Sequence, residues 1–193
     1  MVIENLVRAF GVLPGIGPKT AEKLVYALLK KPSEFKEVFA NDIRASKDMQ
    51  RCASCFTFTP GNLCDLCSDP SRDRTSICVV ADPQDIQVME KTKKFTGRYH
   101  VLGGLISPLE GVAQKQLTID ALIGRVKNEN SREVILALDQ TNQGETTTLL
   151  IAKALKQFPV KISVLARGLP LGSDIEYADD TTLGSAFEGR KEI

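Results

Sequence analysis

The sequence predicts a multidomain α+β protein with four parts in a fixed order. Residues 1–50 show helical periodicity and form an N-terminal helical region, and residues 51–70 carry four closely spaced cysteines typical of a small zinc finger. Residues 71–165 alternate short apolar runs with helical stretches, which predicts an α/β domain with a mostly parallel sheet. Residues 166–193, rich in Gly, Asp and Thr, form a C-terminal segment.

The composition of the 193 residues is that of a globular protein. A hydrophobic content of 42% is ordinary for a folded chain and too high for a disordered one. No apolar run approaches the roughly 18 residues needed to cross a bilayer, so we expect no membrane association. The first residues, Met1 to Glu4, include an early acid and no basic stretch. We therefore expect no secretory signal and a cytoplasmic protein with reduced thiols.

Charge is distributed unevenly along the chain, although the net charge is only +1. Residues 1–31 carry five basic and two acidic side chains, whereas residues 168–193 carry six acidic and two basic ones. A basic end and an acidic end suggest separate partners or head-to-tail self-association. The alternative is that both ends are ordinary solvated surfaces.

The N-terminal region is expected to hold three helices. Apolar stripes with helical spacing run through residues 3–10 and 24–29. Residues 13–19 between them contain two glycines and two prolines, which end the first helix, and Pro18 suits the first turn of the second. A third helix is expected over residues 33–47.

The glycine-rich turn between the first two helices has the features of a phosphate-binding hairpin. We expect the backbone N–H groups of Gly15, Ile16 and Gly17 to point outward beside the start of the second helix. Lys19 and Lys23 are four residues apart and share one face of that helix. Such a unit grips a nucleic-acid backbone without reading bases. The alternative is an ordinary tight connection with solvated lysines, but the string and its flanking helices resemble the helix-hairpin-helix motif of DNA-binding proteins.

The cysteine segment has the spacing C-x2-C-x8-C-x2-C. Each pair forms a short knuckle, and two knuckles supply the tetrahedral thiolate ligands that zinc accepts. With four thiolates bound, no position stays open for water, so we expect one structural Zn²⁺ ion per chain, held by Cys52, Cys55, Cys64 and Cys67. A redox or iron–sulfur site is the alternative. Cys78 lies in an apolar run and is expected to be a buried strand residue.

The α/β part is predicted from its alternating pattern. Strands are expected at residues 77–80, 99–102, 133–138 and 161–165, and helices at 85–92, 116–127 and 145–156. This alternation implies a mostly parallel sheet with helices on its faces. The lone His100 lies in the second strand without a Ser or Cys partner, so we expect a structural role.

The end of the third strand resembles the toprim fold of topoisomerases, primases and recombination proteins. Asp139 follows this strand, and residues 143–145, Gln-Gly-Glu, begin the next helix. Catalytic toprim sites hold Mg²⁺ with a glutamate after the first strand and paired acids after a later one. Here Ala81 replaces that glutamate, Thr141 takes the second paired position, and the Asp82 side chain is expected to face the other way. One carboxylate where three are expected argues against metal-dependent strand chemistry.

The order of the three features resembles the RecR family of bacterial recombination mediators, and the resemblance covers nearly the whole chain. The matching strings lie at residues 13–21, 64–69, 72–74, 77–80, 99–104, 106–111, 133–137, 165–170 and 176–179. Three departures from the family pattern are Ala81, Asp139 where asparagine is common, and Ala113-Gln114 where Gly-Pro is usual. They fall outside the cysteines and the hairpin.

The resemblance implies a non-enzymatic protein of the bacterial cytoplasm, associated with the nucleoid. Family members act with RecO-type and RecF-type partners to load RecA recombinase onto single-stranded DNA, and they assemble into ring-shaped homotetramers through both chain ends. Single- and double-stranded DNA would meet Lys19 and Lys23. Partners would meet an acidic toprim surface, mapped here onto Asp82, Asp139 and Glu145. The tail resembles a Walker-B-like segment that contributes to assembly.

Two other functions remain open from the sequence. The first is a small toprim-type nuclease or topoisomerase-like enzyme, which would nick or relax plasmid with Mg²⁺ and lose this activity in Asp139→Ala. The second is a fragment of an NAD-dependent DNA ligase, which shares the cysteine and hairpin modules. Nothing in the sequence resembles a nucleotidyl-transferase lysine motif, and this reading leaves the α/β half unexplained.

Overall fold

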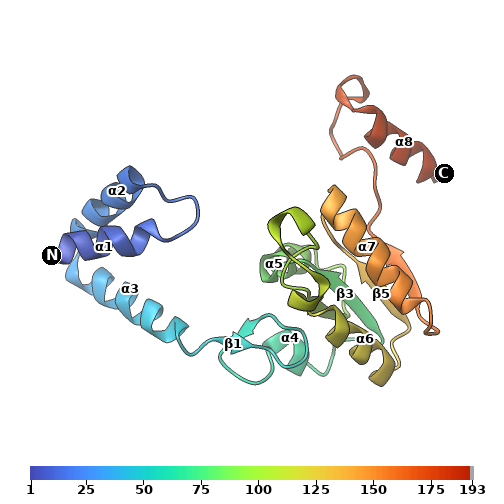
Figure 1. The fold of residues 1–193 in the computed structure, drawn as a ribbon, viewed down its shortest axis with the longest axis horizontal. Coiled ribbons are helices and arrows are strands. Elements are labelled where there is room, and N and C mark those ends of the chain that lie inside the picture. The colour runs from blue at the N-terminus through green and yellow to red at the C-terminus, as the bar shows by residue number, and fades with distance from the viewer. Residues whose placement is uncertain (192–193) are drawn as a thin grey trace. The chain divides into compact units, whose positions relative to one another are not determined.

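The computed structural model describes residues 1–191; residues 192 and 193, which include Glu192 of the acidic end, lie outside the described part. The chain divides into two compact units, one over residues 1–49 and one from Gln50 onward (Figure 1). No helix within the described residues is both long enough and apolar enough to cross a membrane.

The first unit consists of three helices, as predicted. They are α1 (Val2–Gly11), α2 (Pro18–Leu29) and α3 (Ser33–Ser46). Pro18 occupies the first turn of α2, where its missing N–H costs no hydrogen bond. The turn before it needs a left-handed residue, and Gly15 supplies this with φ of 78°.

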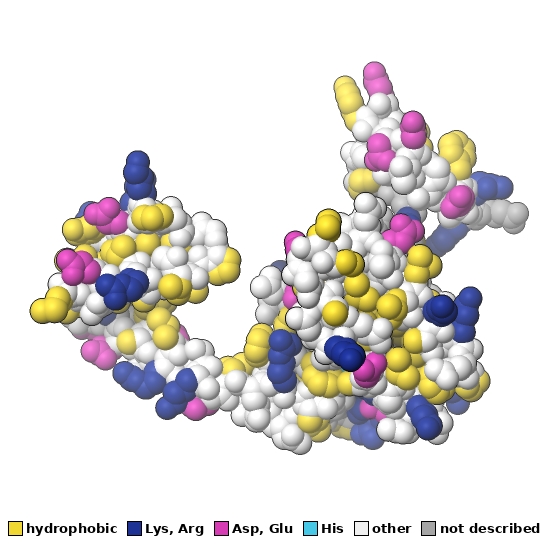
Figure 2. Space-filling model, in the orientation of Figure 1, with side chains coloured by type: hydrophobic (Ala, Val, Ile, Leu, Met, Phe, Trp, Pro, Cys, Tyr) yellow, Lys and Arg dark blue, Asp and Glu magenta, His cyan; other side chains and the backbone are white. Residues whose placement is uncertain are grey.

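The first unit buries very little of its apolar surface. Ala21 and Val25 of α2 are fully buried, whereas α1 and α3 hold no buried residue. Hydrophobic side chains are visible on the face of this unit that Figure 2 shows. The exposed ones include Val2, Val38 and Ile43, which are 73%, 60% and 57% exposed. The predicted apolar stripes therefore exist, but this unit alone does not cover them.

The cysteine segment contains short regular elements that the sequence did not reveal. Strands β1 (Gln50–Arg51) and β2 (Phe58–Thr59) pair antiparallel, and α4 (Asp65–Ser68) follows. Two-residue strands and a single helical turn are too short to produce a periodic pattern.

The α/β part of the second unit contains a parallel sheet, which confirms the predicted fold class. Its strands are β3 (Ser76–Val80), β4 (Arg98–Val101), β5 (Glu133–Leu136) and β6 (Lys161–Val164), in the order β4-β3-β5-β6. All three strand pairs are parallel. The helices are α5 (Pro83–Lys91), α6 (Ile119–Asn128) and α7 (Asn142–Leu155). Their ends differ from the predicted ends by one to three residues.

The two faces of the sheet bury different partners. On β3, Ile77 and Val79 pack with α6 and α7, whereas Cys78 and Val80 pack on the other face with Ile86 of α5. Because strand side chains alternate between faces, a continuous apolar run in β3 serves both cores. The second face also contacts the cysteine segment through Phe56 and Leu66. Cys78 is buried there, as the sequence predicted.

The C-terminal segment contains a helix that the sequence did not predict, α8 (Asp180–Glu188). Asp179 caps it by accepting a hydrogen bond from the Thr182 N–H at 2.9 Å. None of its residues is buried, and only three of the nine, Leu183, Ala186 and Phe187, are apolar. Gly168 allows the preceding chain to approach this helix, because a Cβ there would lie 3.3 Å from the Ala186 Cα.

His100 is a structural residue of β4, as predicted from its isolation. It is fully buried, and its Nε2 lies 3.0 Å from the Thr118 hydroxyl oxygen and 3.1 Å from the Thr118 carbonyl oxygen. The Phe56 ring of the cysteine segment packs edge-on against it, 5.2 Å between centroids. Burial, and secondarily the nearby Arg125 charge, lower the pKa of His100 from 6.5 to about 4.

This lowered pKa predicts an acid-sensitive second unit. Between pH 6.5 and pH 4 the unfolded chain binds a proton that the folded chain does not, so stability falls as pH falls. The loss attributable to His100 between pH 7.5 and pH 5 is about 2 kcal/mol. His100→Gln keeps a donor toward Thr118 and should lack this part of the pH dependence. Urea unfolding of both proteins at the two pH values tests this; an identical pH dependence would contradict it.

Candidate metal centre and nucleic-acid-binding hairpin

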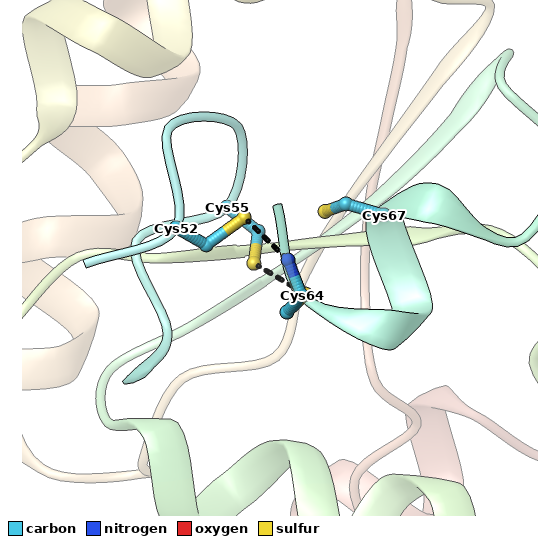
Figure 3. Close-up of side chains that lie close together, drawn as sticks. All are labelled: Cys52, Cys55, Cys64 and Cys67. Carbon is cyan, nitrogen blue, oxygen red and sulfur yellow. Dashed lines mark hydrogen bonds between the residues drawn. The ribbon is translucent and has the colours of Figure 1, made fainter. Parts of the chain in front are cut away.

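The four predicted cysteine ligands lie together in the structure (Figure 3). All their sulfur atoms lie within 4.8 Å of one another, and each side chain is at most 7% exposed. Cys52 and Cys55 come from the loop after β1, Cys64 precedes α4, and Cys67 lies within α4. The two knuckles therefore converge as the spacing predicted.

Backbone hydrogen bonds fix the conformation of both knuckles. In the first, the Phe56 N–H donates to the Cys52 carbonyl at 3.0 Å, and Phe56 adopts a left-handed φ of 65°. In the second, the Cys67 N–H donates to the Cys64 carbonyl at 3.0 Å. The Cys64 N–H donates to the Cys52 sulfur at 3.4 Å, which links the two knuckles. These hydrogen bonds hold the four sulfurs close to one another.

The four thiols influence one another's ionisation. A hydrogen bond from Cys55, with further hydrogen bonds from Ser54, Cys64 and Cys52, outweighs the opposing effect of burial and lowers the pKa of Cys67 to about 5. The same hydrogen bond and burial raise the pKa of Cys55, and burial raises the pKa of Cys64 to about 11. Four buried thiolates need a cation to coexist. The donor set is that of a closed, soft metal site, which fits zinc and leaves no ligand position for water.

The hairpin before α2 has fewer open amides than the sequence suggested. The Ile16 N–H donates to the Leu13 carbonyl at 3.1 Å, so the expectation of an outward Ile16 amide is wrong. The Gly15 and Gly17 N–H groups have no hydrogen-bond acceptor among the described residues. Gly17 caps α2 without a side-chain hydrogen bond. The first turn of α2 therefore leaves backbone donors free for an anion.

Basic side chains continue along α2 from this turn. Lys19 and Lys23 are exposed and line an open groove of about 570 Å³ together with Lys30. Lys30 is not among the residues predicted from the sequence, although its separation of seven residues from Lys23 places it on the same helix face. The three lysines form a row that begins next to the open amides.

The predicted acidic residues lie at the carboxyl edge of the parallel sheet. Asp82 follows β3 and Asp139 follows β5, and these strands are neighbours. Asp82 is the cap residue of α5, and its N–H donates to the Asp85 carboxylate at 2.9 Å. Glu145 in the first turn of α7 is exposed and lies 3.9 Å from Arg167.

Two other features decide what this edge can do. Ala81 is buried and offers no ligand oxygen, and the Thr141 hydroxyl accepts a hydrogen bond from the Gly144 N–H at 3.1 Å. Within residues 1–191, the four cysteines are the one group of three or more His, Cys, Asp or Glu close enough to share a metal. The structure therefore does not bring Asp82, Asp139 and Glu145 together as a metal site. Gly144 is required here, because a Cβ would lie 1.9 Å from the Asp139 carbonyl oxygen.

Three family models match the chain in the order of these parts. They are the RecR helix-hairpin-helix over residues 3–46, the toprim domain over residues 75–166 and the RecR C-terminal region over residues 168–191. The chain belongs to the RecR family. A protein named recombination protein RecR from Synechococcus elongatus is 45% identical over 192 residues, covering 99% of this chain and 96% of that protein. Proteins of the same name from Acaryochloris marina and Rubrobacter xylanophilus are 47% and 44% identical with the same coverage.

The geometry of the cysteines predicts the outcome of replacing a single ligand. Cys64→Ser should lower metal affinity by more than about 100-fold, since even lost outer-shell partners cost 10–100-fold. Cys78→Ala is the matched control, because Cys78 is buried but lies outside the cluster. Elemental analysis after dialysis should find one metal ion per chain in wild type and in Cys78→Ala only. Equal metal content in all three proteins would refute this assignment.

Proposed function

We propose that this chain is a non-catalytic recombination mediator that binds single- and double-stranded DNA and acts with RecO-type and RecF-type partners to load RecA. Membership of a family of recombination proteins supports a role in DNA recombination and repair. The observation that carries the DNA-binding part is the hairpin, where two open amides and a row of lysines lie on one short unit. We also propose that the cysteine centre holds zinc.

The hairpin favours contacts to phosphate over contacts to bases. Its donors are backbone N–H groups of Gly15 and Gly17 and the ammonium groups of Lys19 and Lys23. Backbone N–H groups at the start of a helix bind the oxygens of one phosphate group. Flexible lysine side chains then contact the neighbouring phosphates. Such contacts fix position without reading sequence, as a protein that acts on any damaged DNA requires.

The toprim edge supports a binding role more than a catalytic one. Of the positions that hold Mg²⁺ in catalytic toprim sites, Ala81 lacks an oxygen and the Thr141 hydroxyl is engaged with the start of α7. Asp139 alone is a poor Mg²⁺ site. Exposed Asp82, Asp139 and Glu145 are available instead to a basic partner surface such as a RecO-type protein.

Exposed apolar surface at both ends of the chain supports self-association into a ring, with a homotetramer as the proposed form. In the first unit, Phe35, Val38 and Ile43 of α3 are between 47% and 60% exposed. In the C-terminal segment, Leu171 and Tyr177 are 107% and 82% exposed. Large apolar side chains exposed in this way are available to pack in an interface with another copy of the chain.

Charge reversal on α2 tests the DNA-binding role. The double variant Lys19→Glu, Lys23→Glu should weaken binding at least about 10-fold for single- and double-stranded DNA of any sequence, with a smaller salt dependence because fewer counterions are released. Fluorescence anisotropy titrations at several salt concentrations measure both effects. The same variant should also slow RecA loading onto single-stranded DNA coated by single-strand-binding protein.

Lys153→Glu, Lys156→Glu is the matched control, because it makes the same charge change at two exposed lysines, one in α7 and one directly after it. It should bind DNA within about twofold of wild type. Equal loss of affinity in both double variants would show a general charge effect and contradict the assignment to the hairpin.

The oligomeric state tests the proposed ring. Light scattering should find an oligomer for wild type and a smaller species for Val38→Asp, Ile43→Asp, since a buried aspartate without a partner disfavours the interface. Val88→Asp changes a residue of α5 that is 62% exposed and should leave the oligomer intact. A wild-type monomer at all concentrations, with and without DNA, would exclude the ring.

A further inference from the structure

Two arginines of the α/β domain bind the backbone of the two cysteine knuckles. Arg125 of α6 donates from Nη1 to the Ser54 carbonyl at 3.3 Å, and Ser54 lies between the two cysteines of the first knuckle. Arg98 of β4 donates from Nη2 to the carbonyl of Cys67, itself a predicted ligand in the second knuckle, at 3.5 Å. The two side chains are only 6% and 11% exposed. One domain thus reaches both halves of the metal centre.

These arginines are fixed from behind by the rest of the domain. Arg125 Nη1 also donates to the Tyr99 carbonyl of β4 at 2.6 Å. Arg125 Nε donates to the Glu129 carboxylate at 3.0 Å, and Arg98 Nη1 lies 3.9 Å from the other oxygen of Glu129. A guanidinium is planar and rigid, so anchoring one edge directs the other edge toward the knuckle.

The arginine cluster, formed by Arg98, Arg125 and Glu129, carries an excess of positive charge. Arg98 and Arg125 share one carboxylate, Glu129, which leaves a net charge of +1 in a mostly buried place. Two buried donors, Arg98 Nε and Arg125 Nη2, have no hydrogen-bond partner among the described atoms. Unbalanced buried charge is costly unless an opposite charge lies nearby. Four thiolates around a divalent cation have a net charge of −2, which is the sign that this cluster needs.

A second mostly buried ion pair of the same domain, formed by Arg72 and Glu90, shows that excess positive charge is not a general property of the fold. Arg72 is 12% exposed and pairs with Glu90, which also accepts a hydrogen bond from the Tyr99 hydroxyl at 2.7 Å. Arg72 Nη1 donates to the Gly97 carbonyl at 2.8 Å. This pair is balanced one to one, and its contacts are to Gly97 and Tyr99, not to a cysteine knuckle.

We infer that Arg98 and Arg125 are positioning residues of the metal centre: they hold its two knuckles through the Ser54 and Cys67 carbonyls and offset its negative charge. The inference rests on the metal centre proposed above. It assigns Glu129 the role of orienting Arg125 through a hydrogen bond and of pairing with the charge of Arg98 at 3.9 Å. Metal affinity then depends on residues 31 and 71 positions distant from the knuckle residues they contact.

The test is metal affinity of the full-length protein, measured with zinc against a chromophoric chelator and with cobalt(II) by its absorption bands. Arg125→Met should lower affinity about 10- to 100-fold, the range found for outer-shell partners of metal ligands. Arg98→Met should lower it less, because its hydrogen bond is longer. Arg125→Lys keeps the positive charge but lacks the planar guanidinium that donates from two edges. Its metal affinity should therefore fall between those of Arg125→Met and wild type. The tetrathiolate cobalt bands should stay unchanged, since all four ligands remain.

Arg72→Met is the matched control for loss of a buried arginine. It should lower the urea midpoint of the metal-saturated protein as Arg125→Met does, while its metal affinity stays within about twofold of wild type. Equal affinity losses in Arg72→Met and Arg125→Met, or none in either, would overturn the inference. If wild type binds neither zinc nor cobalt, the metal centre itself is refuted, which is a distinguishable result. If Arg125→Met does not fold, Arg98→Met and Arg125→Lys decide the question.

Discussion

The outer edge of β4 is the constraint on which the arrangement of the second unit depends. In the order β4-β3-β5-β6, β4 lies at an edge, so its outward backbone groups need partners other than a strand. The Val101 N–H donates to the Cys55 carbonyl at 2.8 Å, and the Tyr99 carbonyl accepts from Arg125 at 2.6 Å. The cysteine segment and α6 therefore close the sheet edge together. The metal centre is therefore tied to the α/β domain by hydrogen bonds to its edge strand.

The same edge explains why buried polar residues gather around β4. His100 faces the cysteine segment through Phe56, and Tyr99 donates its hydroxyl hydrogen bond to Glu90. Displacement of the cysteine segment would remove three carbonyl acceptors at once: that of Cys55 for the Val101 N–H, that of Cys67 for Arg98 and that of Ser54 for Arg125. Unpaired buried groups cost about 1–3 kcal/mol each. The segment is short, but its position is strongly determined.

The sequence predicted those features that have a local pattern. The strands were identifiable because apolar runs such as Ile77–Val80 have a distinct length, and the cysteine ligands because C-x2-C pairs form by local backbone geometry. Helix α8 was missed because only three of its nine residues are apolar, which gives a weak periodic signal, and because it contains Gly184. Arg98, Arg125 and Glu129 were missed because their contacts join distant positions, for which one sequence offers no signal. The Ile16 amide was misjudged because the sequence does not show which turn amides bond internally.

The two units differ in how their stability must arise. The second unit has two hydrophobic cores and a closed sheet edge, whereas the first, with 49 residues, fully buries only Ala21 and Val25 among its hydrophobic residues. A unit of this size is marginal even with a good core. In the proposed oligomer, association would cover the exposed surfaces of α1 and α3, so folding of the unit and assembly become linked equilibria. If DNA binds the assembled state more tightly than the separate chains, it would then stabilise the proposed assembly by the same linkage.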